Sequence, residues 1–302
     1  MDEPLVSVII PTYKSTITLK DAIDSVLNQV YKNIEIIVID DNNPNTQERV
    51  STELIINEYR NNDNVNYIQH EKNKNGAAAR NTGFNNSNGQ YICFLDDDDL
   101  FCPDKVKEQV EYLTAHNEYQ AVYCGRYQWN KVITSNKKGD LSEEILSLSF
   151  TPYTSSIMLR RECYIALNGF DENYKRHQDF EFLLRFFELY SIGVIEKPLI
   201  KIKGNQINNA LHGSELEALK DKFLNQFMSH INRIDREKKG FKKMVLAKHY
   251  SALFWNCVKR VRLIIALRVF IKYTQICGFI FWKCIYFHFK NWVESKMEIS
   301  NA

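Results

Sequence analysis

Residues 5–41 read LVSVIIPTYKSTITLKDAIDSVLNQVYKNIEIIVIDD, and this stretch decides the fold class. Its two ends, LVSVII at 5–10 and IEIIVI at 34–39, are apolar and rich in β-branched residues, which is typical of strands buried on both faces. Between them, apolar residues recur at helical spacing. These residues are Leu19, Ala22, Ile23, Val26 and Leu27. The stretch therefore predicts two parallel strands joined by a helix.

The alternation of strands and helices continues through the first two hundred residues. Further strands are expected at 64–69, 90–95, 120–125 and 155–160. Helices are expected at about 45–60, 76–87 and 103–116, and one more carries Phe180, Leu183, Leu184 and Phe187. We therefore expect an α/β, Rossmann-like fold with a mostly parallel central sheet flanked by helices. The absence of G-x-G-x-x-G and G-x-x-x-x-G-K-[ST] argues against NAD enzymes and P-loop NTPases.

Length and charge together predict two units. The 302 residues exceed one small domain, and residues 1–213 carry 22 Lys and Arg against 30 Asp and Glu. Residues 214–302 carry 17 against 7, so we expect an acidic body and a basic, aromatic-rich helical C-terminal region. The seven Cys include no C-x-x-C pair, and the opening residues MDEPLVSVII do not resemble a secretory signal peptide. We therefore expect reduced thiols in a cytoplasmic protein.

Polar and acidic residues follow three of the predicted strands. Pro11, Thr12 and Tyr13 follow the first, Asp41 ends an Asp pair after the second, and Asp96 to Asp99 follow the strand at 90–95. The ends of parallel strands meet at one edge, where α/β proteins bind ligands. Adjacent carboxylates about 5 Å apart repel by roughly 3 kcal/mol at an effective dielectric constant of about 20. Oxygen ligands of this kind favour Mg²⁺ or Mn²⁺. A solvated turn, with Asp99 capping the next helix, is the alternative.

Four segments in order carry a family resemblance. They are VSVIIPTYK (6–14), IEIIVIDDN (34–42), NGAAARNTGFNNSNGQYICFLDDDDLFCPDKV (75–106) and GFDENYKRHQDFEFLLRF (169–186). Over roughly residues 4–208 the chain resembles the family 2 glycosyltransferases, which have the GT-A fold. The resemblance implies a catalytic domain at 1–213, with a nucleotide-binding part at about 1–100 and an acceptor part at about 101–213. Family members transfer a sugar from a nucleotide diphosphate, usually UDP, to a hydroxyl with inversion.

The resemblance also implies roles for individual residues. Pro11 and Tyr13 would frame the uracil ring, Asp41 would accept a hydrogen bond from its N3–H, and Arg80 would approach the nucleotide. The full set of nucleotide-binding candidates is Pro11, Thr12, Tyr13, Asp41, Arg80, Asp96 and Asp97. Tyr13 closing the sheet edge and Arg80 as a surface arginine are the alternatives.

Two carboxylates would perform the chemistry in this family. Within the Asp-x-Asp pair of Asp96 and Asp98, Asp98 would bind Mn²⁺ or Mg²⁺, which stabilises the departing UDP. Asp179 matches the general base, although Asp is also a preferred helix N-cap. His177 is a weaker candidate for the base.

The segment IKIKGNQ at 200–206 departs from the family pattern. Lys201 and Lys203 stand where many members have Arg and His. A charged lysine cannot bind a metal but can neutralise phosphate, so both residues are candidates for diphosphate contacts. His212 is a weak alternative metal ligand. Trp129 and Tyr153 are able to stack on a sugar ring, or else belong to the core.

Residues 238–293 hold 12 basic residues and no acidic residue, interleaved with aromatic ones. No apolar stretch approaches the ~20 residues needed to span a bilayer. We therefore expect peripheral attachment to an anionic membrane surface, at the inner face of the cell membrane. Packing on the body or on a second copy of the chain, as a homo-oligomer, is the alternative. No nucleic-acid motif occurs, and the acidic body would repel nucleic acid.

These expectations combine into a metal-dependent, inverting transfer from a UDP-sugar to a saccharide or lipid-linked saccharide. A metal-dependent nucleotidyltransferase, or a noncatalytic membrane-associated scaffold with the same fold, remains as an alternative.

Overall fold

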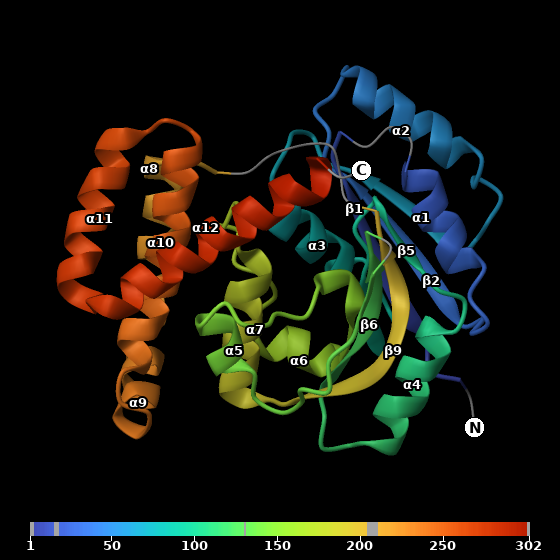
Figure 1. Ribbon diagram of the computed structural model, residues 1–302. Helices are drawn as coiled ribbons and strands as arrows, with labels where there is room; N and C mark the ends of the chain where they lie inside the picture. Colours follow the sequence, from blue (N-terminus) through green and yellow to red (C-terminus); the bar gives the residue numbers. More distant parts are fainter. Residues whose placement is uncertain (1–2, 15–17, 130, 204–210, 301–302) are drawn as a thin grey trace. The chain divides into compact units, whose positions relative to one another are not determined.

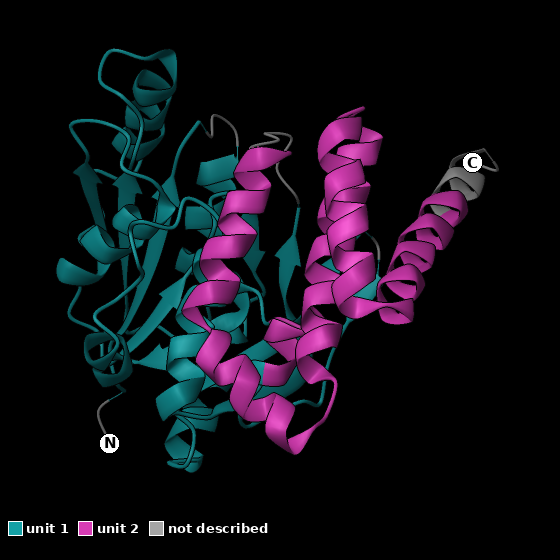
Figure 2. Cartoon of the chain, turned by 90° about the vertical axis from the view of Figure 1, so that its left-hand side faces the viewer, with its two compact units in different colours: residues 1–142, 152–206 teal, residues 143–151, 207–302 magenta. Residues whose placement is uncertain are grey.

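The computed structural model describes residues 3–14, 18–129, 131–203 and 211–300 (Figure 1). The chain forms two compact units, each described by itself (Figure 2). Unit 1 comprises residues 1–142 and 152–206, and unit 2 comprises residues 143–151 and 207–302. The change of unit after residue 206 lies near the boundary expected at 213, but the segment 143–151 joins the C-terminal unit, which sequence analysis did not anticipate.

The first half of unit 1 is a parallel sheet. Its strands are β1 (Val6–Thr12), β2 (Ile34–Asp40), β3 (Val65–Gln69) and β4 (Tyr91–Phe94). The connecting helices are α1 (Thr18–Leu27), α2 (Gln47–Asn57) and α3 (Gly76–Asn85). β1 pairs in parallel with both β2 and β4, and β2 pairs with β3. The apolar runs that predicted β1 and β2 are buried, which confirms the expected α/β fold.

The second half of the sheet mixes directions. Its strands are β5 (Asp99–Phe101), β6 (Ala121–Gln128), β7 (Lys131–Ile133), β8 (Ile157–Arg160) and β9 (Ile192–Ile202). The sheet order is β3–β2–β1–β4–β8–β6–β9–β5, and β7 pairs with β6. β8 is antiparallel to β4 and β6, so β6 and its parallel neighbour β9 run in the direction of β4. The carboxyl ends of β1, β2, β4, β6 and β9 therefore share one edge.

Helices and an aromatic cluster complete unit 1. The remaining elements are α4 (Lys105–Ala115), the 3₁₀ turn η1 (Thr154–Ser156), α6 (Arg161–Ala166) and α7 (Gln178–Leu189). Phe170 stacks on Phe182 of α7 with ring centroids 4.5 Å apart, and it contacts Phe94 of β4 edge-on at 5.4 Å. These rings tie α7 to the strand that precedes the acidic segment.

Unit 2 is helical. It contains α5 (Ser142–Leu146) from 143 onwards, α8 (Ser214–Gln226), α9 (Met228–Glu237), α10 (Phe241–Lys259), α11 (Leu263–Cys277) and α12 (Phe279–Ser300). The central helix is α10, which packs against α8, α9, α11 and α12. His249 of α10 bonds to the carbonyl of Leu146 at 3.0 Å, and Lys238 pairs with Glu143 at 2.6 Å. These contacts explain why segment 143–151 belongs to this unit.

Candidate active site

The acidic segment 96–99 forms a turn directly after β4. The turn is closed by a hydrogen bond from Asp99 N to Asp96 O at 3.0 Å. Its side chains alternate: Asp97 and Asp99 are buried, whereas Asp96 and Asp98 are partly exposed. Burial raises the pKa of Asp98, and the charge of Asp96 raises it further. The alternation turns outward the same two carboxylates that the Asp-x-Asp interpretation selects.

Asp97 lies in the interior and faces the end of β1. Its Oδ2 accepts a hydrogen bond from Tyr13 N at 3.4 Å. Burial raises the pKa of Asp97 to about 7. Hydrogen bonds from the Thr12 hydroxyl and from Tyr13 N–H act in the opposite direction but do not cancel this effect. Asp97 and Thr12 thus join the acidic turn to β1 in buried positions, and their nucleotide-binding roles stay predictions. Pro11 and Tyr13, by contrast, are partly exposed.

Asp99 is held by a residue that sequence analysis missed. The Ser155 hydroxyl donates to Asp99 Oδ2 at 2.7 Å and accepts a hydrogen bond from Asp96 N at 3.2 Å. Burial, followed by the charge of Asp96, raises the pKa of Asp99 to about 8. The helix-cap alternative for Asp99 is wrong, because Asp99 begins β5 and α4 has Asp104 at its N-cap position.

Arg80 of α3 connects the acidic turn with α7. Its Nη2 bonds to Asp96 Oδ1 at 2.6 Å, and its Nη1 donates to Gln178 Oε1 at 3.0 Å. The guanidinium also lies over the ring of Phe170, at 5.5 Å from the centroid. Arg80 is therefore a partly buried bridge between two segments more than 80 residues apart, and the surface-arginine alternative does not describe it.

Asp179 is the second residue of α7, directly after Gln178. The pKa of Asp179 is raised, mainly by burial and also by the charge of Asp96. A hydrogen bond from the N–H of Phe180 and the charge of Arg80 limit the increase. The structure therefore brings Asp179 within electrostatic reach of both ends of the Arg80–Asp96 pair. The N-cap position belongs to His177, whose ring packs on Phe180 at 5.1 Å, so the N-cap alternative for Asp179 is wrong.

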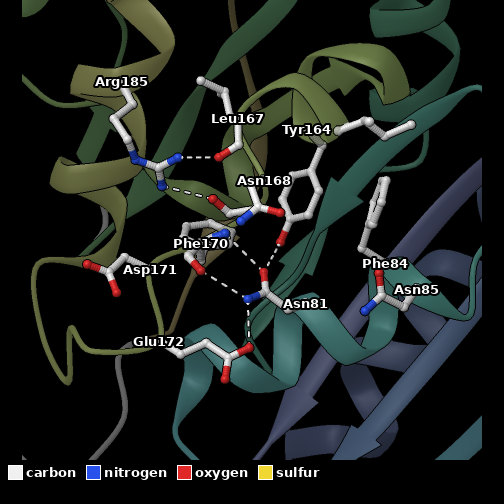
Figure 3. A pocket seen from close by; sticks show the side chains of 12 residues that line it. Asn81, Phe84, Asn85, Tyr164, Leu167, Asn168, Phe170, Asp171, Glu172 and Arg185 are labelled. Carbon is white, nitrogen blue, oxygen red and sulfur yellow. Dashed lines mark hydrogen bonds between the residues drawn. The ribbon is translucent and has the colours of Figure 1, made fainter.

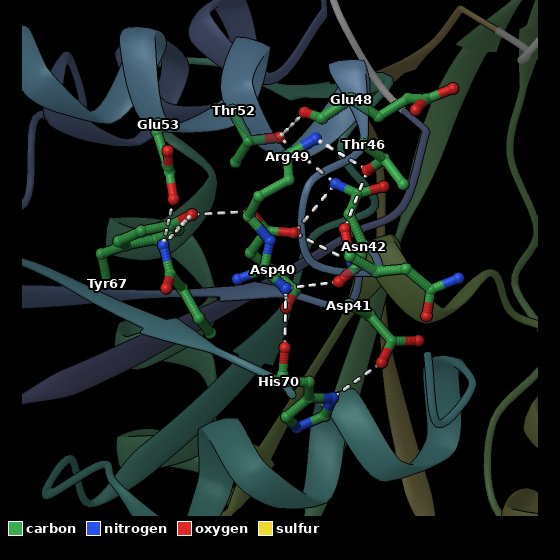
Figure 4. A network of polar contacts seen from close by, with 12 residues as sticks. Asp40, Asp41, Asn42, Thr46, Glu48, Arg49, Thr52, Glu53, Tyr67 and His70 are labelled. Carbon is green, nitrogen blue, oxygen red and sulfur yellow. Dashed lines mark hydrogen bonds and ion pairs between the residues drawn. The ribbon is translucent and has the colours of Figure 1, made fainter. Parts of the chain in front are cut away.

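Asp41 has contacts different from those expected (Figure 4). It is 2% exposed, and its Oδ1 lies 2.7 Å from His70 Nδ1 and accepts from Lys74 N at 2.8 Å. Its Oδ2 accepts from Asn73 Nδ2 at 2.8 Å and from Asn75 N at 3.0 Å. A carboxylate offers about four acceptor sites, so these donors already occupy Asp41. Its hydrogen bond to uracil stays a prediction that requires the 70–75 loop to yield a donor position.

Two lysines near the end of the acceptor part, Lys201 and Lys203, lie at the same sheet edge as the acidic turn. Lys201 is exposed on β9, where its backbone pairs with Leu100 of β5 and Tyr127 of β6. Lys203 Nζ pairs with Asp21 of α1 at 2.8 Å, and both side chains are largely exposed. Exposed pairs of this kind are weak, so Lys203 remains available to a phosphate.

A pocket of about 680 Å³ opens between α3, α6 and residues 167–172 (Figure 3). Asn81 crosses one side of it: its Oδ1 accepts from Tyr164 OH at 2.6 Å and Phe170 N at 2.9 Å. Its Nδ2 donates to Phe170 O at 3.0 Å and Glu172 at 2.9 Å. Asn81 thus fixes the segment that leads into α7, next to Arg80 on the same helix.

The donor set fits a metal shared with a substrate. Within the described ranges, no cluster of three or more His, Cys, Asp or Glu side chains is arranged to hold an ion. Mg²⁺ in nucleotide sites needs only one or two carboxylates, with phosphates and water completing the shell. Asp96 and Asp98 supply two such carboxylate groups at the open side of the turn.

The fold is that of the GT-A glycosyltransferases. The crystal structure of S. aureus TarS 1–349 in complex with UDP-GlcNAc matches with a TM-score of 0.59 and 18% identity, covering 90% of this chain and 92% of that one. Residues 7–184 match the model of glycosyl transferase family 2, more than half of the chain. The chain therefore belongs to that family.

Two curated relatives are similar in sequence. The amylovoran biosynthesis glycosyltransferase AmsB of Erwinia amylovora is 30% identical over 207 residues, which cover 64% of this chain and 67% of AmsB. An uncharacterized glycosyltransferase of Rickettsia bellii is 30% identical over 239 residues. That alignment covers 73% of this chain but only 33% of the longer relative.

Proposed function

We propose that this glycosyltransferase moves a sugar from a UDP-sugar to a hydroxyl of a saccharide or lipid-linked saccharide, with inversion at the anomeric carbon. The observation that carries the proposal is the Arg80 bridge, because it joins the Asp-x-Asp turn to the first turn of α7, which bears Asp179. The UDP-GlcNAc bound to TarS supports the class of donor, and the role of AmsB in amylovoran biosynthesis supports a saccharide acceptor.

Asp179 is proposed as the general base. As the acceptor oxygen attacks the anomeric carbon, its proton passes to the Asp179 carboxylate and the bond between that carbon and the diphosphate breaks on the opposite face. The raised pKa of Asp179 makes it a stronger base than an exposed aspartate. Arg80 bonds to Asp96 and to the side chain of Gln178, which precedes Asp179 in α7, so that the base meets the acceptor in one geometry.

The nucleotide is proposed to lie at the ends of β1 and β4. Pro11 near the end of β1 and Tyr13 directly after it are partly exposed and would frame a base, and Lys201 and Lys203 would neutralise the diphosphate. Asp98, with Asp96, would hold Mn²⁺ or Mg²⁺, which as a bound ion neutralises charge on the leaving diphosphate.

Two measurements test this function. UDP-sugars are screened for turnover with Mn²⁺ and with Mg²⁺, and the products are analysed. Free UDP and a glycosylated acceptor are expected, whereas pyrophosphate would indicate nucleotidyl transfer. UDP affinity is then measured with and without Mn²⁺ for the wild type and for Asp98→Ala. We expect Mn²⁺ to strengthen binding only in the wild type; equal, metal-independent binding by both proteins contradicts the role of Asp98.

We also propose that unit 2 attaches the enzyme to an anionic membrane surface, which would place it at the cytoplasmic face of the cell membrane. No helix in the described part of the chain has the length and apolar character to cross a bilayer. α11 buries Ala266, Val269 and Tyr273 but exposes an apolar row, the α11 ridge. The ridge consists of Leu263, Ile264, Leu267 and Ile271, which are 61%, 87%, 60% and 50% exposed.

Charge favours lipid over a second copy of the chain as the partner of the α11 ridge. Exposed Arg260, Arg262 and Lys272 flank the ridge, and residues 238–293 contain no acidic residue. A contact between two identical ridges would bring these like charges together, whereas anionic headgroups would neutralise them. Exposed Trp282 and Tyr286 on α12 are of the type enriched at membrane interfaces.

A further inference from the structure

Trp129 occupies a position that suits neither the core nor the turn. Trp129 directly follows β6, and Gln128 of β6 forms the last ladder pair with Lys131 of β7. Trp129 is 77% exposed and has a φ of 47°. The favoured two-residue hairpins need a positive φ at their first loop residue, which Asn and Gly supply most easily. A bulky aromatic residue is disfavoured at this backbone conformation, and because Trp129 is exposed, no gain from burial offsets the strain.

The sheet places Trp129 on the edge that carries the acidic turn. Gln128 pairs with Ile202 of β9, and Ile202 pairs with Asp99 of β5. Neighbouring strands are about 4.8 Å apart, so Gln128 lies roughly 10 Å across the sheet from Asp99. Trp129 is the next residue beyond that row, at the carboxyl end of β6.

A second exposed aromatic residue lies beside this hairpin. Tyr153 is 37% exposed, and its hydroxyl accepts a hydrogen bond from Gln128 Nε2 at 3.4 Å. The guanidinium of Arg126 lies over the Tyr153 ring, 4.2 Å from its centroid. Two residues further along the chain, Ser155 holds Asp96 and Asp99. The aromatic pair is therefore connected to the acidic turn through both β6 and η1.

We infer that Trp129 and Tyr153 form an acceptor subsite that stacks on a pyranose ring, an inference that rests on the proposed function. The C–H groups on one face of a pyranose carry partial positive charge, which suits the negative face of an aromatic ring. The candidates for holding a base, Pro11 and Tyr13, lie at the end of β1, which β4 and β8 separate from β6. A sugar on the acceptor side, rather than the nucleotide, therefore matches this position.

Titration of the four tryptophans tests the assignment directly. The protein is labelled with 5-fluorotryptophan, and the Trp129 resonance is identified by its loss in Trp129→Phe. The probes are the methyl glycosides of glucose, galactose, mannose, N-acetylglucosamine and N-acetylgalactosamine, with UDP as a control ligand. We expect at least one glycoside to shift the Trp129 resonance. A Trp129 resonance that none of them moves, or that UDP moves more than any of them does, overturns the inference.

Steady-state kinetics supply the second test. They use the UDP-sugar that the wild-type enzyme turns over and the methyl glycoside that it uses best as an acceptor. Trp129→Ala should raise the acceptor KM about tenfold, and leave the donor KM and acceptor-independent hydrolysis of the UDP-sugar unchanged. Trp129→Asn, which suits the hairpin, should show the same raised KM with an equal or higher melting temperature. Trp129→Phe should retain a KM near that of the wild type.

The outcomes separate this inference from the proposed function. An acceptor KM unchanged in both Trp129→Ala and Trp129→Asn refutes the subsite while leaving the transferase in place. A wild-type protein that consumes no UDP-sugar refutes the proposed function itself, and the subsite with it.

Discussion

Asp179 combines a partly buried position with a role that requires a negative charge. Burial raises its pKa, and the charge of Arg80 limits the increase. A base with a raised pKa takes a proton more readily, but it is ionised only at a correspondingly higher pH. At the residue scale, the balance between burial and the Arg80 charge therefore sets both the strength of the base and its working range.

This balance predicts the pH dependence of transfer. The base must be ionised, so kcat/KM for the acceptor should fall as the pH decreases through the raised pKa of Asp179. The acid limb should therefore lie above the value of about 3.9 that is ordinary for Asp. The pH profile of kcat/KM measures it, since this ratio reports the free enzyme. An acid limb at or below the ordinary value would show that Asp179 is not the limiting base.

Sequence reasoning selected the acidic residues of the candidate site but not the partners that orient them. The Asp-x-Asp pattern selects Asp96 and Asp98, and the structure turns these two outward. Ser155 and Gln178 lie 59 and 98 residues from their partners Asp96 and Arg80, and neither residue type marks a site in sequence. Pairings of this kind follow only from the tertiary fold, as does the network around Asp41.

At the scale of elements, α3 positions the site through two adjacent residues. Arg80 links the acidic turn to α7, and Asn81 binds the backbone of Phe170, which leads into α7. The side chain of Asn75 accepts from the N–H groups of Ala77 and Ala78 at the helix start. The helix is therefore fixed at its N-terminus and along the face that meets the site.

The Arg80 bridge makes a prediction for Arg80→Lys. An ammonium on a flexible chain lacks the planar fork of Arg, so it cannot maintain the bonds to both Asp96 and Gln178. Because misplacement of about 1 Å costs on the order of a hundredfold, kcat should fall by roughly that factor. Steady-state kinetics measure it, with Arg236→Lys in unit 2 as a matched control. An Arg80→Lys enzyme with the kcat of the wild type would rule out the bridge as a positioning device.

The strands differ in how far sequence predicts them. Apolar runs predict β1 and β2 correctly, because both faces of these strands are buried and require apolar residues. β9 was missed, since Glu196, Lys197 and Lys201 interrupt its apolar residues, and partial exposure permits them. β5 was missed because it has only three residues and begins at Asp99 of the acidic run. The strand β5 forms because its residues pair with β9, a tertiary contact that the local sequence does not reveal.

At the scale of the whole molecule, the small net charge of +2 conceals two oppositely charged parts. Residues 1–213 carry the acidic excess, and several of those carboxylates lie at the proposed site. Residues 214–302 carry the basic excess, in helices of unit 2 that expose apolar side chains. In the proposed function, the acidic part serves metal and nucleotide binding and the basic part serves membrane attachment.

The membrane proposal predicts the behaviour of α11 variants. Binding is measured by flotation with vesicles of phosphatidylcholine and phosphatidylglycerol, and with phosphatidylcholine alone. An apolar side chain contributes roughly 1.5–3 kcal/mol when fully buried, so Ile264→Ser with Leu267→Ser should weaken binding by on the order of a hundredfold. Leu54→Ser is the matched control, since Leu54 is a 64% exposed residue of α2 in unit 1.

High salt should also weaken binding to the anionic vesicles. Wild-type protein that floats with neither kind of vesicle, or a double variant that binds as the wild type does, contradicts attachment through the α11 ridge. Concentration-dependent self-association that the double variant abolishes would indicate instead that a second copy covers the ridge.

Transfer by Asp179→Asn tests the proposed chemistry most directly. Asn has nearly the same shape but cannot accept the acceptor proton, and it removes a partly buried charge, so the variant should fold and bind UDP as the wild type does. Transfer rates and UDP affinity are measured side by side, with the UDP-sugar that the wild type uses. We predict loss of transfer with unchanged UDP affinity. Transfer by Asp179→Asn at the wild-type rate would contradict the assignment of Asp179 as the general base.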